Sequence, residues 1–267
     1  MNRYLTFTAL VLFLGLAAVS PIHLNATTIP GIDDLAANTW LWCNGCASDN
    51  GNTNARGGVA NVTQSGYTID GSSVRFDLIK NCSGSCGYGN VFFYNILTHN
   101  VAQTSVTIDM YAMMDSAGNA NSQAAEFTVE HDLCKTRCGF SDEQDFRYIF
   151  SLQCDFNGGF WRVWDGAGNA PGKPPGSGTW QPTQHPCVKF QANSFNHFVF
   201  HFTRGNQNIT YTDMWINNVQ YPINQNYGIQ YDTPNSHSQF LASVQLDGNS
   251  TQGQYSMWVD KWSVTYQ

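Results

Sequence analysis

The feature that most constrains the fold is a series of short segments in which apolar and polar residues alternate. A period of two is typical of β-strands with one buried face. No segment has the periodicity of an amphipathic helix, so the chain is predicted to be all-β, a two-sheet antiparallel β-sandwich or jelly roll. The predicted strands cover residues 67–79, 90–97, 105–114, 123–133, 146–156, 160–165, 195–204, 211–223, 240–248 and 255–267.

Composition limits both the number of domains and the kinds of partner. The chain has 267 residues, of which 42% are hydrophobic, and this suits one sandwich domain over residues 27–267. A formal net charge of −7 argues against nucleic acid, which requires a basic surface, and against an anionic membrane surface.

The N-terminal residues 1–26 have the pattern of a signal peptide. Arg3 precedes an apolar run over residues 4–18, which is shorter than the ~20 residues that a membrane-spanning helix needs. We therefore expect a secreted protein, extracellular or periplasmic, without a membrane anchor.

Eight cysteines in an exported chain predict disulfide bonds. The closely spaced cysteines are expected to form local staples, and Cys154 is expected to pair with Cys187. Zinc is the competing interpretation of the short spacings. The cysteines with short spacings are Cys43 and Cys46, Cys82 and Cys86, and Cys134 and Cys138.

The segment QAAEFTVEHDL at residues 123–133 carries the main functional signal. Successive strand side chains point to opposite faces, so Glu126, Thr128 and Glu130 share one face while Phe127 and His131 lie on the other. Asp132 adds a third acid to the face of Glu126 and Glu130, and such a face can serve catalysis, sugar binding or metal binding, or can simply be solvated.

Three segments resemble the concanavalin A-like lectin/glucanase superfamily. AAEFTVE (124–130) is similar to the Glu-x-Asp-x-Glu strand of family 16 glycoside hydrolases. FNHFVFHFTR (195–204) resembles a strand of laminin-G-like sandwiches, and MWVDKWSVTYQ (257–267) resembles the closing strand of family 16 enzymes. The whole also resembles secreted bacterial members of this superfamily, over roughly residues 60–267.

The resemblance implies a jelly roll and specific roles for three acids. Glu126 and Glu130 would be the catalytic pair of a retaining glycoside hydrolase that acts on a β-glucan-type polysaccharide. Thr128 departs from the family pattern, which has Asp at this position. Asp260 matches the ligand of a structural calcium ion, and no other cofactor is implied.

A binding function uses the same face. The residues expected to join Glu126 and Glu130 on a concave sheet, as ligands for a polysaccharide or glycan, are Thr128, Gln153, Arg162, Trp164, Trp180, Gln245 and Asp247, with Trp161 as an alternative stacking residue. An arginine beside acids also suits a uronic acid, by bidentate pairing. Glycan binding is the favoured hypothesis, and the alternatives are the hydrolase, a polysaccharide lyase and a structural or adhesive sandwich.

The sequence also gives predictions for three loops and for two histidines. Residues 27–60 and 224–238 are predicted to be loops, as is the Gly/Pro-rich stretch 165–186 around Trp180. His197 and His201 share a strand face, where packed or edge histidines are expected rather than metal ligands.

Overall fold

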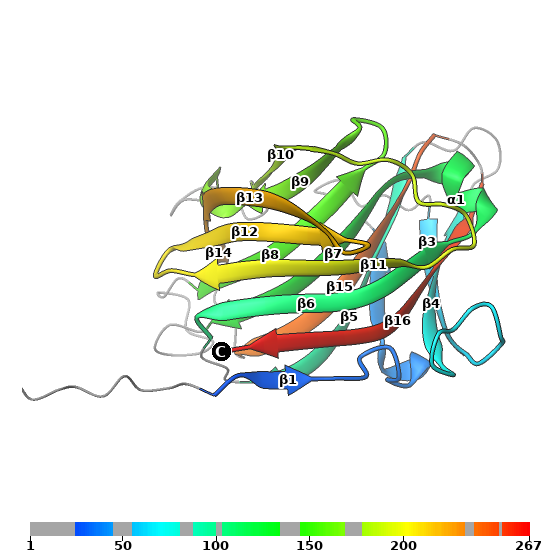
Figure 1. Ribbon diagram of the computed structural model, residues 1–267, viewed down its shortest axis with the longest axis horizontal. Coiled ribbons are helices and arrows are strands. Elements are labelled where there is room, and N and C mark those ends of the chain that lie inside the picture. Colours follow the sequence, from blue (N-terminus) through cyan, green and yellow to red (C-terminus); the bar gives the residue numbers. More distant parts are fainter. Residues whose placement is uncertain are drawn as a thin grey trace, which may run out of the picture.

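The computed structural model describes residues 25–44, 55–80, 88–99, 103–133, 145–168, 178–232, 238–250 and 253–267, and consists of two antiparallel sheets packed face to face (Figure 1). The predicted all-β sandwich is therefore confirmed. Most of the predicted signal peptide (1–24) and the cysteines at 46, 82, 86, 134 and 138 lie outside the described residues.

Sheet A has the strand order β13-β12-β11-β6-β16-β4-β3, and β1 also pairs with β16. The last strand, β16, therefore lies in the middle of the sheet, between β6 and β4. The bounds are β1 Thr27–Ile29, β3 Ala55–Val62, β4 Ser73–Lys80, β6 Ser105–Met114, β11 Asn196–Arg204, β12 Asn208–Ile216, β13 Val219–Gly228 and β16 Tyr255–Tyr266.

Sheet B has the order β10-β9-β8-β7-β15-β5-β2, and β14 also pairs with β8. The central strand β7 contains the acids singled out in the sequence. The bounds are β2 Leu41–Asn44, β5 Gly89–His99, β7 Ser122–Leu133, β8 Asp145–Asp155, β9 Phe160–Asp165, β10 Thr179–Pro186, β14 Gln230–Asp232 and β15 Gln239–Gly248.

The core lies between the sheets and is rich in aromatic rings. Phe127 of β7 packs against Phe198 and Phe200 of β11, with ring centroids 5.5 and 6.1 Å apart. Trp161 of β9 contacts the same two phenylalanines at 5.9 Å. These contacts define the inner face of sheet B, so by alternation Glu126 and Arg162 lie on its outer face.

Several predicted loops contain strands. β1, β2 and the start of β3 lie within 27–60, and β10 lies within 165–186, of which residues 169–177 are outside the described part. β13 and β14 extend into 224–238. Alternation is weak in these stretches because several of the strands are edge strands or short, so neither face is consistently apolar.

The predicted strand 211–223 is two strands joined by a tight turn. Asn217 and Asn218 both have positive φ, 50° and 67°, and separate β12 from β13. Left-handed backbone at both turn positions is the geometry of a type I′ hairpin, which asparagine tolerates better than most residues.

Helical structure is scarce among the described residues. α1 covers Ser116–Asn121, where Asp115 caps the N-terminus by accepting a hydrogen bond from Gly118 N at 2.7 Å. The 3₁₀ turns are η1, Ala37–Thr39, and η2, Gly166–Gly168. Within the described ranges, none of the helices has the length and apolar character that crossing a bilayer requires.

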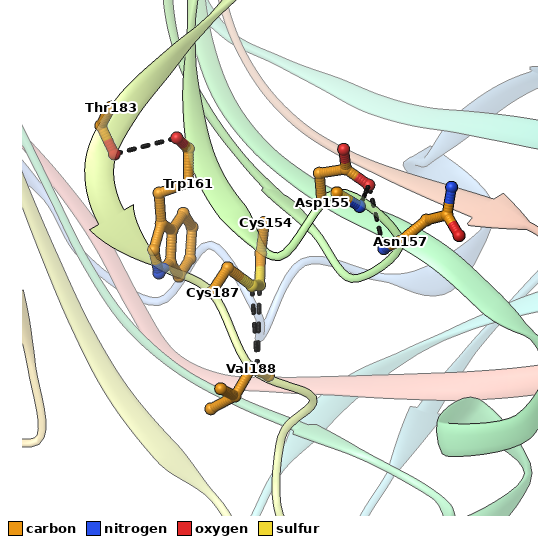
Figure 2. The surroundings of a disulfide bond; sticks show 8 residues. Cys154, Asp155, Asn157, Trp161, Thr183, Cys187 and Val188 are labelled. Carbon is orange, nitrogen blue, oxygen red and sulfur yellow. Dashed lines mark hydrogen bonds between the residues drawn. A yellow bond between two sulfur atoms is a disulfide. The ribbon is translucent and has the colours of Figure 1, made fainter.

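The predicted bridge between Cys154 and Cys187 is present, with Cα atoms 5.6 Å apart. It ties the end of β8 to the segment that follows β10 (Figure 2). Cys43 is also disulfide-bonded. The bridge holds together the end of sheet B that carries β8, β9 and β10.

Candidate functional site

A row of polar side chains crosses the outer face of sheet B. Glu126 of β7 lies directly opposite Gln153 of β8 on one side and Gln245 of β15 on the other. Gln153 lies opposite Arg162 of β9. Four residues predicted for the site from separate strands therefore meet in one line.

Two further rows run parallel to this one. Thr128 lies opposite Ser151 and Ser243, two residues along the strands. Asp247 lies opposite Asn90 of β5 in the third row. We call the outward polar residues of the three rows the polar face: Asn90, Glu126, Thr128, Ser151, Gln153, Asp155, Ser243, Gln245 and Asp247. All of them are buried, although they point away from the core.

Aromatic pairs lie on both sides of the polar face. Trp164 and Trp180 form an edge-to-face pair with centroids 5.1 Å apart, and Trp164 Nε1 donates to Gln230 Oε1 at 3.1 Å. On the other side, Phe92 and Tyr94 of β5 lie 5.7 Å apart. Such rings provide flat apolar surfaces with polar edges, the features that bind sugar rings.

Trp161, the alternative stacking residue, does not lie on the polar face. It is 2% exposed and belongs to the core. Its parity on β9 is opposite to that of Arg162 and Trp164, so it cannot reach the outer face.

Glu126 is buried and hydrogen-bonded to two hydroxyls. Its Oε1 accepts from Thr128 Oγ1 at 3.0 Å and from Ser151 Oγ at 3.2 Å. Burial, reinforced by the nearby Asp247 carboxylate, raises the pKa of Glu126 to about 8, although the two hydroxyls lower it. Glu126 therefore holds a proton at neutral pH.

Asp247 is the second buried acid of the polar face. Burial raises its pKa to about 7, while hydrogen bonds from Tyr88 and Gln245 lower it. Gln245 Nε2 lies 2.9 Å from Asp247 Oδ1. Asp247 is the acid that perturbs the Glu126 pKa most, more than Glu130 does.

Glu130 and Asp155 have a different environment, because each forms an ion pair. Arg147 Nη1 lies 3.1 Å from Glu130 Oε1, and Arg162 Nη2 contacts Asp155 Oδ2. Asp155 also accepts hydrogen bonds from the backbone N of Asn157 and Gly158, at 3.0 and 2.9 Å (Figure 2 shows the first). A Cβ at residue 158 would clash with the Asp155 carboxylate, so this turn requires glycine.

Three polar atoms of the polar face are buried without a partner in the described part of the chain. They are Oε1 of Gln245, Oδ1 of Asn90 and Oγ of Ser243. Buried polar atoms almost always form hydrogen bonds, and an exception is a candidate contact for a ligand. Since all three lie on β5 and β15, they mark one side of the face.

Asp260 lies on the other sheet, in a cluster of acids. Its carboxylate oxygen and those of Asp33 and Asp70 lie within 4.8 Å of one another. Asp33 Oδ1 accepts from Trp262 N at 2.7 Å, and Asp260 Oδ2 accepts from Ile69 N at 2.5 Å. Three loops or strands distant in sequence therefore converge on one point.

The cluster fits a hard cation such as calcium. Asp260 is fully buried, and among the described residues its Oδ1 has no hydrogen-bond partner. Burial raises the pKa of Asp33 to about 6 and also raises that of Asp260, and neighbouring carboxylates add to both shifts. Carboxylate oxygens are the ligands that calcium prefers.

The two predicted sheet histidines lie on the outer face of sheet A. His197 Nε2 is 2.8 Å from Asp109 Oδ1, and His201 Nδ1 is 2.5 Å from Asp213 Oδ1. Tyr111 stacks on the His197 ring at 4.4 Å. His131 points into the core beside Phe240, as its parity predicts.

Some residues of the two sites have no clear signal in the sequence. Phe92 and Tyr94 lie in a strand that is apolar on both faces, so alternation does not show which residues point outward. Asn90 and Tyr88 adjoin a Gly-rich stretch. Asp33 lies 227 positions from Asp260, and of the three clustered acids only Asp260 was predicted as a metal ligand.

Comparisons with known proteins give distant structural neighbours. No protein-family profile matches the chain, and no curated protein matches its sequence. One structural neighbour is a carbohydrate-binding module of the β-sandwich superfamily, with 11% identity, a TM-score of 0.41, and coverage of 86% of this chain and 59% of that one.

Two more neighbours have similar scores. An alginate lyase from Chlorella virus has 12% identity and a TM-score of 0.43, covering 80% of this chain and 93% of that one. A family 11 carbohydrate-binding module from Clostridium thermocellum, solved with a mixed-linked tetrasaccharide, has 12% identity and a TM-score of 0.35, covering 89% and 94%. At such identities the likeness concerns the fold alone.

Proposed function

We propose that this is an exported protein of the concanavalin A-like type that binds a polysaccharide across the outer face of sheet B. One observation carries the proposal: Arg162, Gln153, Glu126 and Gln245 form a continuous polar row between two aromatic pairs. Sugars are recognised by this combination of amide and carboxyl groups with stacking rings. The unpartnered Oε1 of Gln245 and Oδ1 of Asn90 would accept hydrogen bonds from sugar hydroxyls.

Retention on insoluble polysaccharides tests this function. Gln245→Leu removes the amide from the centre of the row and should reduce retention about tenfold, since one buried hydrogen bond to a ligand is lost. The matched control is Gln220→Leu, on sheet A, where Gln220 Nε2 bonds Asp213 Oδ2 at 2.7 Å. Equal retention of the two variants, both folded by circular dichroism, would move the site away from sheet B.

Hydrolysis is a second candidate, and the protonated state of Glu126 favours it. A glycosidase needs a carboxylic acid that keeps its proton near neutral pH, and the raised Glu126 pKa supplies one. Glu130 forms an ion pair with Arg147. Asp247 lies on β15, diagonally across from Glu126 on the neighbouring strand β7. Asp247 is therefore the better second carboxyl.

Reducing-end release from β-glucans, xylan, galactans and alginate tests the enzymatic candidate. Release that disappears in Glu126→Gln and Asp247→Asn but persists in Glu130→Gln would assign hydrolysis to the diagonal pair. Release that requires Glu130 would assign it to the pair on β7. Absence of release from every substrate would leave the binding function alone.

A structural cation at Asp33, Asp70 and Asp260 completes the proposal. The carboxylates would hold the ion, and the ion would neutralise their charge and tie together the segments that carry them. Asp260 lies on sheet A and the other two acids lie in turns beside it, so the role of the ion would be stability rather than contact with the glycan.

A further inference from the structure

Two ion pairs on the outer face of sheet B expose their arginines to solvent more than their acids. The Arg147 and Arg162 side chains are 32% and 35% exposed, whereas their partners Glu130 and Asp155 are 8% and 5% exposed. The two carboxylates lie beneath, and the guanidinium groups lie above them. A ligand approaching this face meets the arginines first.

The two acids of the polar face that form no described ion pair, Glu126 and Asp247, add little negative charge. Glu126 and Asp247 are buried, and burial raises their pKa values to about 8 and about 7. At neutral pH these raised pKa values leave both groups less negative than exposed carboxyl groups. The polar face therefore does not strongly repel an anion.

Arg162 belongs to an accessible stripe on β9. Phe160, Arg162 and Trp164 occupy alternate positions, so they lie in a line on the outer face at intervals of ~6.7 Å. Phe160 is 47% exposed, and Trp164 is partly exposed beside Trp180. A guanidinium between two aromatic surfaces can pair with an acidic group while neighbouring rings stack.

The contacts of Arg162 leave it able to bind an anion. Its Nη2 pairs with Asp155, and the arginine fork offers four more N–H donors. Asp155 is also held by the backbone N of Asn157 and Gly158. The Asp155 carboxylate therefore interacts with three donors. It orients the Arg162 guanidinium but does not use all of its N–H groups, so the others can bind a ligand.

We propose that the polysaccharide bound by sheet B is anionic, with an acidic group of the sugar paired to Arg162 and its rings against Phe160 and the Trp164–Trp180 pair. This inference rests on the proposed function and specifies its ligand class. Carboxylates of uronic acids and sulfate esters share the chemistry that would be recognised, because both present oxygens that a guanidinium can bind in bidentate fashion.

Affinity electrophoresis in gels containing a polyuronate, a sulfated galactan or a neutral β-glucan tests the inference. At low salt we expect retardation by at least one of the anionic polymers to exceed that by the β-glucan, and to weaken as salt is added. The two anionic gels separate carboxylate from sulfate recognition. Arg162→Gln should weaken anionic binding about tenfold or more, and Arg162→Lys should weaken it less.

Arg75→Gln is the matched control. Arg75 pairs with Asp77 at 3.0 Å with a similar exposure of 38%, but it lies on sheet A, so its loss should leave binding unchanged. Equal or stronger binding of the neutral glucan would overturn the inference while sustaining the proposed function. Unchanged anionic binding by Arg162→Gln would also overturn it. Failure of the wild type to bind any polymer would overturn both.

Discussion

Thr128 Oγ1 donates a hydrogen bond of 3.0 Å to Glu126 Oε1, within a strand where both side chains point away from the core. The same hydroxyl contacts Ser151 Oγ, which also donates to Glu126. A hydroxyl thus stands where the resemblance of AAEFTVE to family 16 glycoside hydrolases implies an aspartate. It lowers the Glu126 pKa without adding charge, so a buried acid is stabilised by two neutral donors.

Thr128→Asp should destabilise the fold in a pH-dependent way. It would place another buried carboxyl beside Glu126, with a cost of ~3 kcal/mol at pH 8 and less at pH 5, where both acids are protonated. Denaturant unfolding at the two pH values measures this. Thr128→Val, which removes the hydroxyl without adding charge, is the control, and an equal loss for Thr128→Asp at both pH values would contradict the explanation.

Glu126→Gln should flatten the dependence of stability on pH. Because the folded-state pKa of Glu126, about 8, exceeds its unfolded value of about 4.5, the folded protein binds the extra proton between these values. Its contribution is therefore present at low pH and is lost as pH rises through 8. Melting temperatures from pH 4.5 to 9 should fall less steeply in the variant, and parallel curves would show that Glu126 is ionised throughout.

Removing the Cys154–Cys187 bridge should cost about 2–4 kcal/mol. The bridge spans a sequence separation of 33 residues, and closing such a loop restricts the unfolded chain. The double variant Cys154→Ala/Cys187→Ala should melt several degrees lower than the wild type by calorimetry. An unchanged melting temperature would show that β8 and the segment after β10 are held by packing alone.

Chelation should destabilise the protein through the acid cluster of sheet A. EDTA should lower the melting temperature and added calcium should restore it, because an ion bound there would neutralise Asp33, Asp70 and Asp260. Asp260→Asn should abolish this response, while Asp109→Asn, on the same sheet but outside the cluster, should preserve it. A response to calcium that survives in Asp260→Asn would place the ion elsewhere.

Trp180→Ala should weaken retention on insoluble polysaccharide about tenfold, because a ring contact and its pairing with Trp164 are lost. A pull-down against the wild type measures the loss. Val188→Ala is a suitable control, since Val188 is 75% exposed and is not among the residues of the polar face. Equal retention of the three proteins would exclude this aromatic pair from the site.

Where one face of a strand is clearly apolar, the alternation of apolar and polar residues predicted which side chains point outward to the site. Glu126, Gln153 and Gln245 were identified in this way, from strands that share no local sequence. The same reasoning could not orient Phe92 and Tyr94, since β5 is apolar on both faces. It also missed Asp33, whose proximity to Asp260 depends on the paths of distant segments. The expected Cys154–Cys187 bridge is present, although cysteine spacing alone does not fix the connectivity. The Asn217-Asn218 turn lies inside an otherwise continuous strand pattern, so alternation did not predict it.

The position of β16 has a consequence for the order in which the molecule can form. Residues 255–266 separate β6 from β4, so sheet A has a gap at its centre until this segment arrives. Earlier strands can pair among themselves, but the two halves of the sheet cannot join during synthesis of residues 1–254. Completion of sheet A therefore follows synthesis of these last strand residues.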